Sequence, residues 1–294
     1  MGKRAGKYLS LSGLDTATKS REELIEIFND LMSNGIHGLC FSLYEDGQVP
    51  GDQISEEQVR RRIGIIAPYS KWVRSFSCTE GNEFIPKIAK EFGLKTLVGA
   101  WLGSNEEKNA AEIQGLKKLT EEGLVDIAAI GNEVMYREDL TEEQLLTYLF
   151  DFKKDFPETQ MGYVDAYYEF SARPKITEAC DVILSNCYPF WEGCHIDYSL
   201  PYMKDMYHQA KDAGAGKKVI ITETGWPSEG GGFEGSLASE ENFLRYFINA
   251  QQWCEKDNIE MFYFSSFDES WKTGDEGDVG AYWGLWDKNE LLKW

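Results

Sequence analysis

The feature that most constrains the fold of this chain is a repeated alternation of strand-like and helix-like segments. Short apolar runs, each typical of a buried strand, are followed by segments with helical periodicity. They recur at roughly 30- to 35-residue intervals, the size of one strand–helix unit, at 36–43, 71–76, 94–101, 124–130, 159–164, 180–186, 219–221 and 259–265. Eight such units predict an α/β fold in one domain, a (β/α)8 or TIM barrel.

Local signals mark several helix boundaries. The segment that begins at Arg21 carries apolar residues three and four positions apart, the stripe of an amphipathic helix, and Asn34-Gly35 ends it. We assign residues 1–35 to a short N-terminal helical extension and residues 36–294 to the barrel. Capping boxes at 55–58 and 141–144 predict two further helix starts, and Ser239 is a predicted N-cap. A doubly wound open sheet is the alternative, but its glycine-rich phosphate turns are absent, which favours the barrel.

Composition and charge exclude several classes of partner. The formal net charge of −20 over 294 residues argues against nucleic acid and against an anionic membrane surface. No apolar run approaches the roughly 18 residues of a membrane-spanning helix. The basic start at 1–7 is not followed by an apolar stretch of signal-peptide length, so the protein either lacks a leader or is numbered after its removal. We expect a monomer, and we suspect a secreted, cell-surface or periplasmic location.

The metal-binding residue types show no pattern that indicates a metal site. The six cysteines form no CxxC pair and are too sparse for a disulfide framework. The three histidines lack the spacing of metal ligands. Asp275, Glu276 and Asp278 do not match the spacing of a calcium loop, and we expect a solvated acidic loop. The sequence therefore predicts no metal site and no cofactor.

Two glutamates follow predicted strands at positions suited to chemistry. Glu223 comes directly after the strand at 219–221 and before a turn rich in Gly, Pro and Ser. Such a carboxylate either faces water at the strand end or is a catalytic group held at the rim of the barrel. Glu133 follows the fourth strand, three strand–helix units earlier, which places the two carboxylates on opposite sides of the barrel mouth. Two facing carboxylates are the minimum for cleaving a glycosidic bond.

Further candidates also follow predicted strands, where TIM barrels carry their active sites. They are Tyr44, Arg74, Trp101, Asn132, Asp165, Tyr188, Glu269 and Lys272. Glu83 repeats the Gly-Asn-Glu pattern of 131–133, but it lies beyond the end of its strand and at the start of a helix. We expect it to interact with the helix dipole and to take no part in catalysis.

Three motifs at these strand ends resemble glycoside hydrolase family 17. They are Ile-Gly-Asn-Glu at 130–133, Thr-Glu-Thr-Gly-Trp-Pro-Ser at 222–228 and Phe-Asp-Glu-Ser-Trp-Lys at 267–272, and the resemblance covers about residues 36–294. The Trp-Pro-Ser-x-Gly-Gly element is the most specific part. The resemblance implies a β-1,3-glucanase or a glucanosyltransferase, with Glu133 as acid/base and Glu223 as nucleophile of a retaining mechanism. The first strand departs from the plant members and is closer to the microbial pattern, so endo cleavage of long glucans is not implied.

The residues around the two glutamates have predicted roles. Asn132 is expected to hydrogen-bond the 2-hydroxyl of the sugar. Arg74 is expected to keep Glu223 ionised and Tyr188 to donate to it, although ordinary packing or a structural ion pair is the alternative. Glu269 and Lys272 are expected to form an ion pair that shapes the cleft. The remaining substrate-binding candidates are Tyr44, Asp165 and five possible sugar-stacking rings that otherwise belong to the core, Tyr136, Trp191, Trp226, Phe267 and Trp271.

The leading hypothesis is a retaining glycoside hydrolase that cleaves a laminarin-type β-1,3-glucan through a glucosyl-enzyme intermediate. A first alternative keeps this chemistry but transfers the intermediate to another glucan, as a glucanosyltransferase. A second alternative is a glucan-binding barrel without catalytic activity. Other barrel glycosidases, such as β-mannanases and cellulases, share the two-glutamate layout and are disfavoured by the Trp-Pro-Ser-x-Gly-Gly element.

Overall fold

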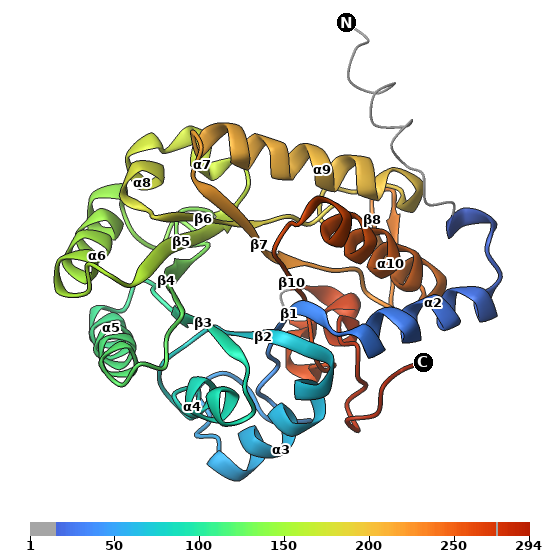
Figure 1. The fold of residues 1–294 in the computed structure, drawn as a ribbon, viewed down its shortest axis with the longest axis horizontal. Coiled ribbons are helices and arrows are strands. Elements are labelled where there is room, and N and C mark those ends of the chain that lie inside the picture. The colour runs from blue at the N-terminus through green and yellow to red at the C-terminus, as the bar shows by residue number, and fades with distance from the viewer. Residues whose placement is uncertain (1–15, 275) are drawn as a thin grey trace, which may run out of the picture.

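Eight parallel strands close into a barrel in the computed structural model, which describes residues 16–274 and 276–294. Their order around the ring is β1-β10-β7-β6-β5-β4-β3-β2, and Figure 1 shows the helices arranged outside this ring. The predicted (β/α)8 barrel is therefore confirmed. The strands are β1 (Ile36–Cys40), β2 (Ser70–Ser75), β3 (Lys95–Ala100), β4 (Ile127–Asn132), β5 (Gln160–Ala166), β6 (Val182–Asn186), β7 (Lys218–Thr224) and β10 (Met261–Tyr263).

The strands bury almost every side chain, because helices cover the barrel and other side chains fill it. The covering helices are α2 (Arg21–Asn34), α3 (Glu56–Ile66), α4 (Phe84–Glu91), α5 (Glu106–Glu121), α6 (Glu142–Asp155), α7 (Glu169–Ala172), α8 (Pro174–Ala179), α9 (Ile196–Ala213) and α10 (Glu240–Asp257). A small antiparallel hairpin, β8 (Gly232–Phe233) with β9 (Ser236–Leu237), lies in the loop between β7 and α10.

Helix caps agree with the sequence signals in part. Thr141 and Gln144 form the predicted capping box of α6. Ser55 caps α3 by accepting from the backbone of Gln58, but the predicted box is incomplete. The Gln58 side chain turns away and donates to the carbonyl of Leu43 at 3.0 Å, which satisfies a buried acceptor in the loop after β1. A capping box that the sequence analysis missed opens α2 at Ser20.

The helix α2 shares the hydrophobic core of the barrel. Its buried residues Leu24, Phe28 and Met32 belong to the same apolar cluster as the strands. The Phe28 ring lies 4.9 Å from the ring of Phe247 on α10 and 5.4 Å from that of Trp294 near the C-terminus. Residues 1–15 of the predicted N-terminal extension lie outside the described residues. Within the described part of the chain, no helix combines the length and apolar content needed to cross a bilayer.

Pairing between strands shifts register near the carboxyl end of the barrel. Between β4 and β5 the shift falls between Ala129 and Asn132. Between β6 and β7 it falls between Ser185 and Asn186, and Asn186 lies opposite Glu223. Such irregularities redirect side chains next to active sites. The two polar strand ends that matter most below are therefore set by breaks in the regular ladder.

Candidate active site

Glu223 is a buried carboxylate with three side-chain donors around it. It lies near the end of β7 and is 6% exposed. Its Oε1 accepts from Arg74 Nη1 at 2.7 Å and from Asn186 Nδ2 at 3.1 Å. Its Oε2 accepts from the Tyr188 hydroxyl at 2.8 Å. A carboxylate at this depth costs free energy unless it is paired and hydrogen-bonded, and these donors meet both conditions.

The two predicted contacts of Glu223, with Arg74 and Tyr188, are present in the structure. Arg74 is buried on β2, and its second nitrogen donates to Asn132 Oδ1 at 2.7 Å. One guanidinium therefore orients the candidate nucleophile and the neighbour of the candidate acid together. Burial, and next the charge of Glu223, raise the pKa of Tyr188, so that its hydroxyl stays protonated and donates.

Glu133 occupies a different environment from Glu223. Burial, and next the negative charge of Glu223, raise the pKa of Glu133 from an ordinary 4.5 to about 7. A donor from Asn186 opposes this shift. Glu133 thus keeps a proton near neutrality beside an ion-paired carboxylate. A carboxyl that keeps its proton beside one paired with an arginine suits an acid and a nucleophile.

Asn186 joins the two glutamates and was missed by the sequence analysis. Its Nδ2 donates to Glu133 Oε1 at 2.8 Å and to Glu223 Oε1 at 3.1 Å, so these two oxygens lie within about 6 Å of each other. Thr222 Oγ1 donates to Asn186 Oδ1 at 2.8 Å and fixes the amide orientation. The available signal was its place as the last residue of a strand, the criterion that selected the other candidates.

The backbone of Glu133 is left-handed, with φ of +52°. For a residue with a side chain this conformation costs roughly 1–2 kcal/mol. The preceding Gly131 also has a positive φ, and an added Cβ there would lie 2.9 Å from Val134 Cγ2. In the Gly-Asn-Glu sequence at 131–133, backbone geometry therefore requires the glycine at position 131, and the site requires the side chain of Glu133.

The predicted ion pair between Glu269 and Lys272 is confirmed. Lys272 Nζ lies 2.6 Å from Glu269 Oε2, and both side chains are largely buried. The Lys272 ammonium also lies 4.1 Å from the centre of the Phe264 ring. Burial raises the pKa of Glu276 to about 7, with Lys272 opposing the shift. The expected solvated loop is therefore wrong for Glu276, which turns inward toward this pair; Asp278 is exposed, and Asp275 lies outside the described residues.

The candidate sugar-stacking rings divide into core and accessible ones. Trp226 and Phe267 are fully buried, so the prediction that they stack on a sugar is wrong. Trp226 packs against Phe190 and Tyr246, and Phe267 against Trp286, because the loops after β7 and β10 fold back over the barrel. The rings that keep accessible surface are Tyr136, Trp191, Trp271 and Tyr44, and the last lies edge-on to Trp271 at 5.8 Å.

Asp165 does not reach toward a substrate. It is fully buried and accepts hydrogen bonds from the hydroxyl of Tyr163 and from the backbone of Ala166 and Tyr136. Its predicted substrate-binding role is therefore wrong, because its oxygens face the protein. Glu83 lies at the start of α4 as expected, and its carboxylate accepts from the backbone of Gly81 at 2.8 Å.

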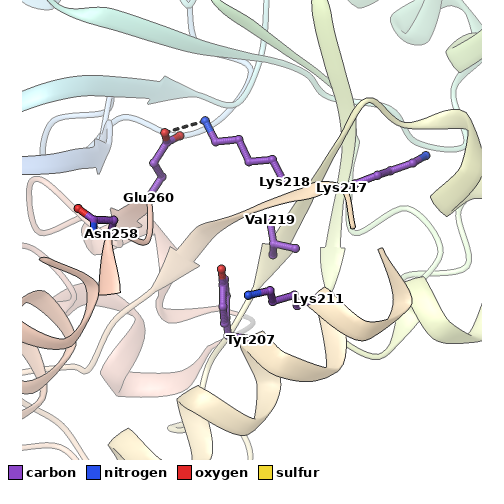
Figure 2. A pocket seen from close by; sticks show the side chains of 7 residues that line it. All are labelled: Tyr207, Lys211, Lys217, Lys218, Val219, Asn258 and Glu260. Atoms are coloured by element: carbon purple, nitrogen blue, oxygen red, sulfur yellow. Dashed lines mark hydrogen bonds and ion pairs between the residues drawn. The ribbon is translucent and has the colours of Figure 1, made fainter. Parts of the chain in front are cut away.

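A cavity of about 240 Å³ lies at the opposite end of the barrel (Figure 2). It borders Lys218 at the start of β7, whereas Glu223 lies near the other end of that strand. Lys218 is paired with Glu260 at 2.6 Å. Lys217 donates to three backbone carbonyls and points away from this pair in Figure 2. Because these charges are already satisfied, we place the candidate site at the glutamates.

The sequence of this chain matches a known family of enzymes. Residues 38–284 match the BtgE/BtgC glycoside hydrolase domain. The chain belongs to this glycoside hydrolase family. The resemblance to glycoside hydrolase family 17 is thereby confirmed, and the chain is a glycosidase by family.

Individual relatives agree with this assignment. The chain is 29% identical over 234 residues to a glucan 1,3-beta-glucosidase of Arthroderma benhamiae, covering 74% of this chain and 75% of that protein. It is 24% identical over 308 residues to a glucan 1,3-beta-glucosidase of Schizosaccharomyces pombe, covering 97% and 93%. A solved structure of an active-site mutant of a beta-1,3-glucanosyltransferase from Rhizomucor miehei, in complex with laminaritriose, superposes with a TM-score of 0.79, and the structure of that glycoside hydrolase family 17 enzyme superposes with a TM-score of 0.78. The two chains are 27% identical, with 89% of this chain and 96% of that one covered.

Proposed function

We propose that this glycoside hydrolase cleaves β-1,3-linked glucan with retention of anomeric configuration, using Glu223 as nucleophile and Glu133 as acid/base. The supporting observation is the amide of Asn186, which contacts both carboxylates and holds the two oxygens that it contacts within about 6 Å of each other. Retaining glycosidases place the two groups roughly 5 to 5.5 Å apart, whereas inverting ones leave about 6.5 to 9.5 Å for a water. The separation here favours retention.

The environments of the two glutamates fit the two steps. In the first step Glu223, paired with Arg74, attacks the anomeric carbon while protonated Glu133 gives its proton to the leaving oxygen. The glycosidic bond breaks and a glucosyl ester forms on Glu223. In the second step Glu133, now ionised, removes a proton from water, and the hydroxide replaces Glu223 at the same carbon. Tyr188 and Arg74 then donate again to the released carboxylate of Glu223.

Substrate identity rests on the relatives and on the polar groups at the rim. The curated relatives are named for β-1,3-glucan, and the aligned glucanosyltransferase was crystallised with laminaritriose. Asn132 lies next to Glu133, and its oxygen is engaged by Arg74, which leaves its amide nitrogen as the donor for the sugar 2-hydroxyl. We propose the same class of glucan here. The monomeric state and the compartment stay predictions.

Retention is tested by identifying which anomer of the product forms first. Proton NMR of laminarihexaose digestion is expected to show the β anomer of the new reducing end before mutarotation. Initial release of the α anomer would exclude a covalent intermediate. Mass spectrometry with a 2-fluoro laminaribioside is expected to locate the trapped sugar on Glu223, and Glu223→Ala is expected to trap none and to lose turnover while still folding, with an unchanged circular dichroism spectrum.

Transfer to a glucan acceptor is the second candidate, supported by accessible rings beyond the catalytic pair. Trp191 is partly exposed and lies 6.0 Å from the ring of Phe233, which is 42% exposed on the hairpin after β7. Rings of this kind hold a sugar acceptor in place of water. Products longer than the starting laminari-oligosaccharide would identify transfer. Exclusive formation of shorter products at high substrate concentration would identify hydrolysis.

A further inference from the structure

Two neighbouring positions on β5 carry buried polar side chains that the proposed mechanism does not use. Tyr163 is 1% exposed and Asp165 is fully buried, and the Tyr163 hydroxyl donates to Asp165 Oδ2. Residues two apart on a strand point to the same side. Here that side faces the turn that follows β4, which carries Glu133.

The side-chain pair contacts the backbone of this turn at two successive amides. The amide of Met135 donates to the Tyr163 hydroxyl at 2.8 Å. The amide of Tyr136 donates to Asp165 Oδ2 at 3.3 Å. The amide of Glu133 itself donates to the carbonyl of Val164, between the two side chains, at 2.8 Å. Strand β5 therefore accepts three hydrogen bonds from the turn.

These contacts surround the left-handed residue of the site. A glutamate with φ of +52° returns to an extended or helical backbone unless its surroundings prevent it. The Tyr163 ring packs against Gly131 at the start of this turn, where an added Cβ would lie 3.4 Å from the ring. The hydroxyl and the carboxylate thus hold the turn from one side while the ring packs beneath its start.

We propose that Tyr163 and Asp165 are positioning residues for the acid/base step, and that they fix the carboxyl of Glu133 at the glycosidic oxygen by holding the backbone of residues 133–136. This inference rests on the proposed function of Glu133. Both residues act through the turn and touch no substrate. Removing either contact therefore lets the Glu133 carboxyl move, and displacements of about 1 Å at a catalytic group reduce rates by up to roughly 100-fold.

Comparing kcat/KM on two substrates distinguishes a loss of acid positioning from a general loss of activity. A laminari-oligosaccharide needs its leaving oxygen protonated, whereas 2,4-dinitrophenyl β-laminaribioside carries a leaving group that departs without an acid. For Tyr163→Phe we expect kcat/KM on laminaritetraose to fall at least about 10-fold, and kcat/KM on the dinitrophenyl substrate to stay within about threefold of wild type. Asp165→Asn is expected to show the same pattern more weakly, because an amide oxygen still accepts from Tyr136.

The control variants keep this test separate from the proposed function. Tyr207→Phe removes the hydroxyl of a buried tyrosine that lines the cavity at the opposite end of the barrel, and it is expected to change kcat/KM on neither substrate. Glu133→Ala must itself show the split between substrates, and if it does not, the assignment of Glu133 fails. If Glu133→Ala shows the split while Tyr163→Phe and Asp165→Asn lower both substrates equally, or neither, the positioning role alone is overturned.

Discussion

Arg74 contributes both a positive charge and several hydrogen bonds to this site. Its guanidinium is buried and binds Glu223 Oε1, Asn132 Oδ1 and the carbonyl of Thr222. Replacing it by methionine leaves Glu223 buried without its cation, which typically costs about 3 to 5 kcal/mol. We expect Arg74→Met to lower the free energy of unfolding in urea by roughly that amount and kcat/KM by about 100-fold or more.

An exposed ion pair provides the matched control for Arg74. Arg60 on α3 pairs with Glu91 at the surface, where solvent screens the charges. Arg60→Met is expected to leave the urea midpoint and kcat/KM essentially unchanged. Equal losses in the two arginine variants would show that the buried pair has no special energetic role.

The protonation of Glu133 predicts the pH dependence of catalysis. Its pKa is raised to about 7, and the acid must hold its proton for the first step. We therefore expect kcat/KM on laminaritetraose to fall as the pH rises through about 7. In Glu133→Gln the residual activity should lose this alkaline limb. A limb that persists unchanged in the variant would assign the titration to another group.

The raised pKa of Glu133 also predicts how the stability of the protein changes with pH. The unfolded chain releases the Glu133 proton near 4.5, whereas the folded protein keeps it up to about 7. Wild type therefore loses stability as the pH rises from 4.5 to 7, because the folded state must then hold a disfavoured charge. Glu133→Gln should unfold at a higher urea concentration than wild type at pH 8 and at a similar one at pH 4.

At the scale of elements, α2 is expected to behave as part of the barrel. Phe28 is fully buried between Phe247 on α10 and Trp294. Removing a buried phenylalanine ring costs about 3 to 5 kcal/mol, so Phe28→Ala should unfold at a markedly lower urea concentration. Glu26→Ala, at an exposed position of the same helix, is the control and should change little. Equal stability of the two variants would instead support α2 as a separable extension.

The boundaries of elements were less predictable than their order. The strand expected at 259–265 spans only Met261–Tyr263, and the amide of Ser265 donates to the carbonyl of Trp283, in the last segment of the chain, instead of to a neighbouring strand. A sequence window contains no information on a partner so far along the chain. The Ser55 cap shows the same limit, since Gln58 has a better acceptor at Leu43 than in its own helix.

At the scale of the whole molecule, barrel topology explains which site residues the sequence revealed. Closing eight parallel strands brings the carboxyl ends of all the strands to one rim of the barrel. Glu133 and Glu223 therefore meet there although many residues separate them in the sequence. Whether a strand-end side chain faces the catalytic glutamates depends on the loops and turns that pack against it. Trp226 is buried because the loop after β7 folds back over the barrel, and Asp165 accepts from the turn after β4. Asn186, like the other candidates, stands at the end of a predicted strand and could have been selected on that criterion.

The net charge of the chain predicts how salt affects its stability. Fifty acidic side chains against thirty basic ones give a formal net charge of −20, and compaction brings like charges together. Near neutral pH, raising NaCl from about 10 to about 300 mM shortens the Debye length from roughly 30 Å to below 10 Å and screens this repulsion. We expect the thermal midpoint to rise by a few degrees at pH 7.5. Near the isoelectric point of about 4.6 the repulsion vanishes and the rise should shrink. A midpoint that falls with salt at pH 7.5 would mean that attractive surface ion pairs, such as Arg21 with Glu240, outweigh the excess of negative charge.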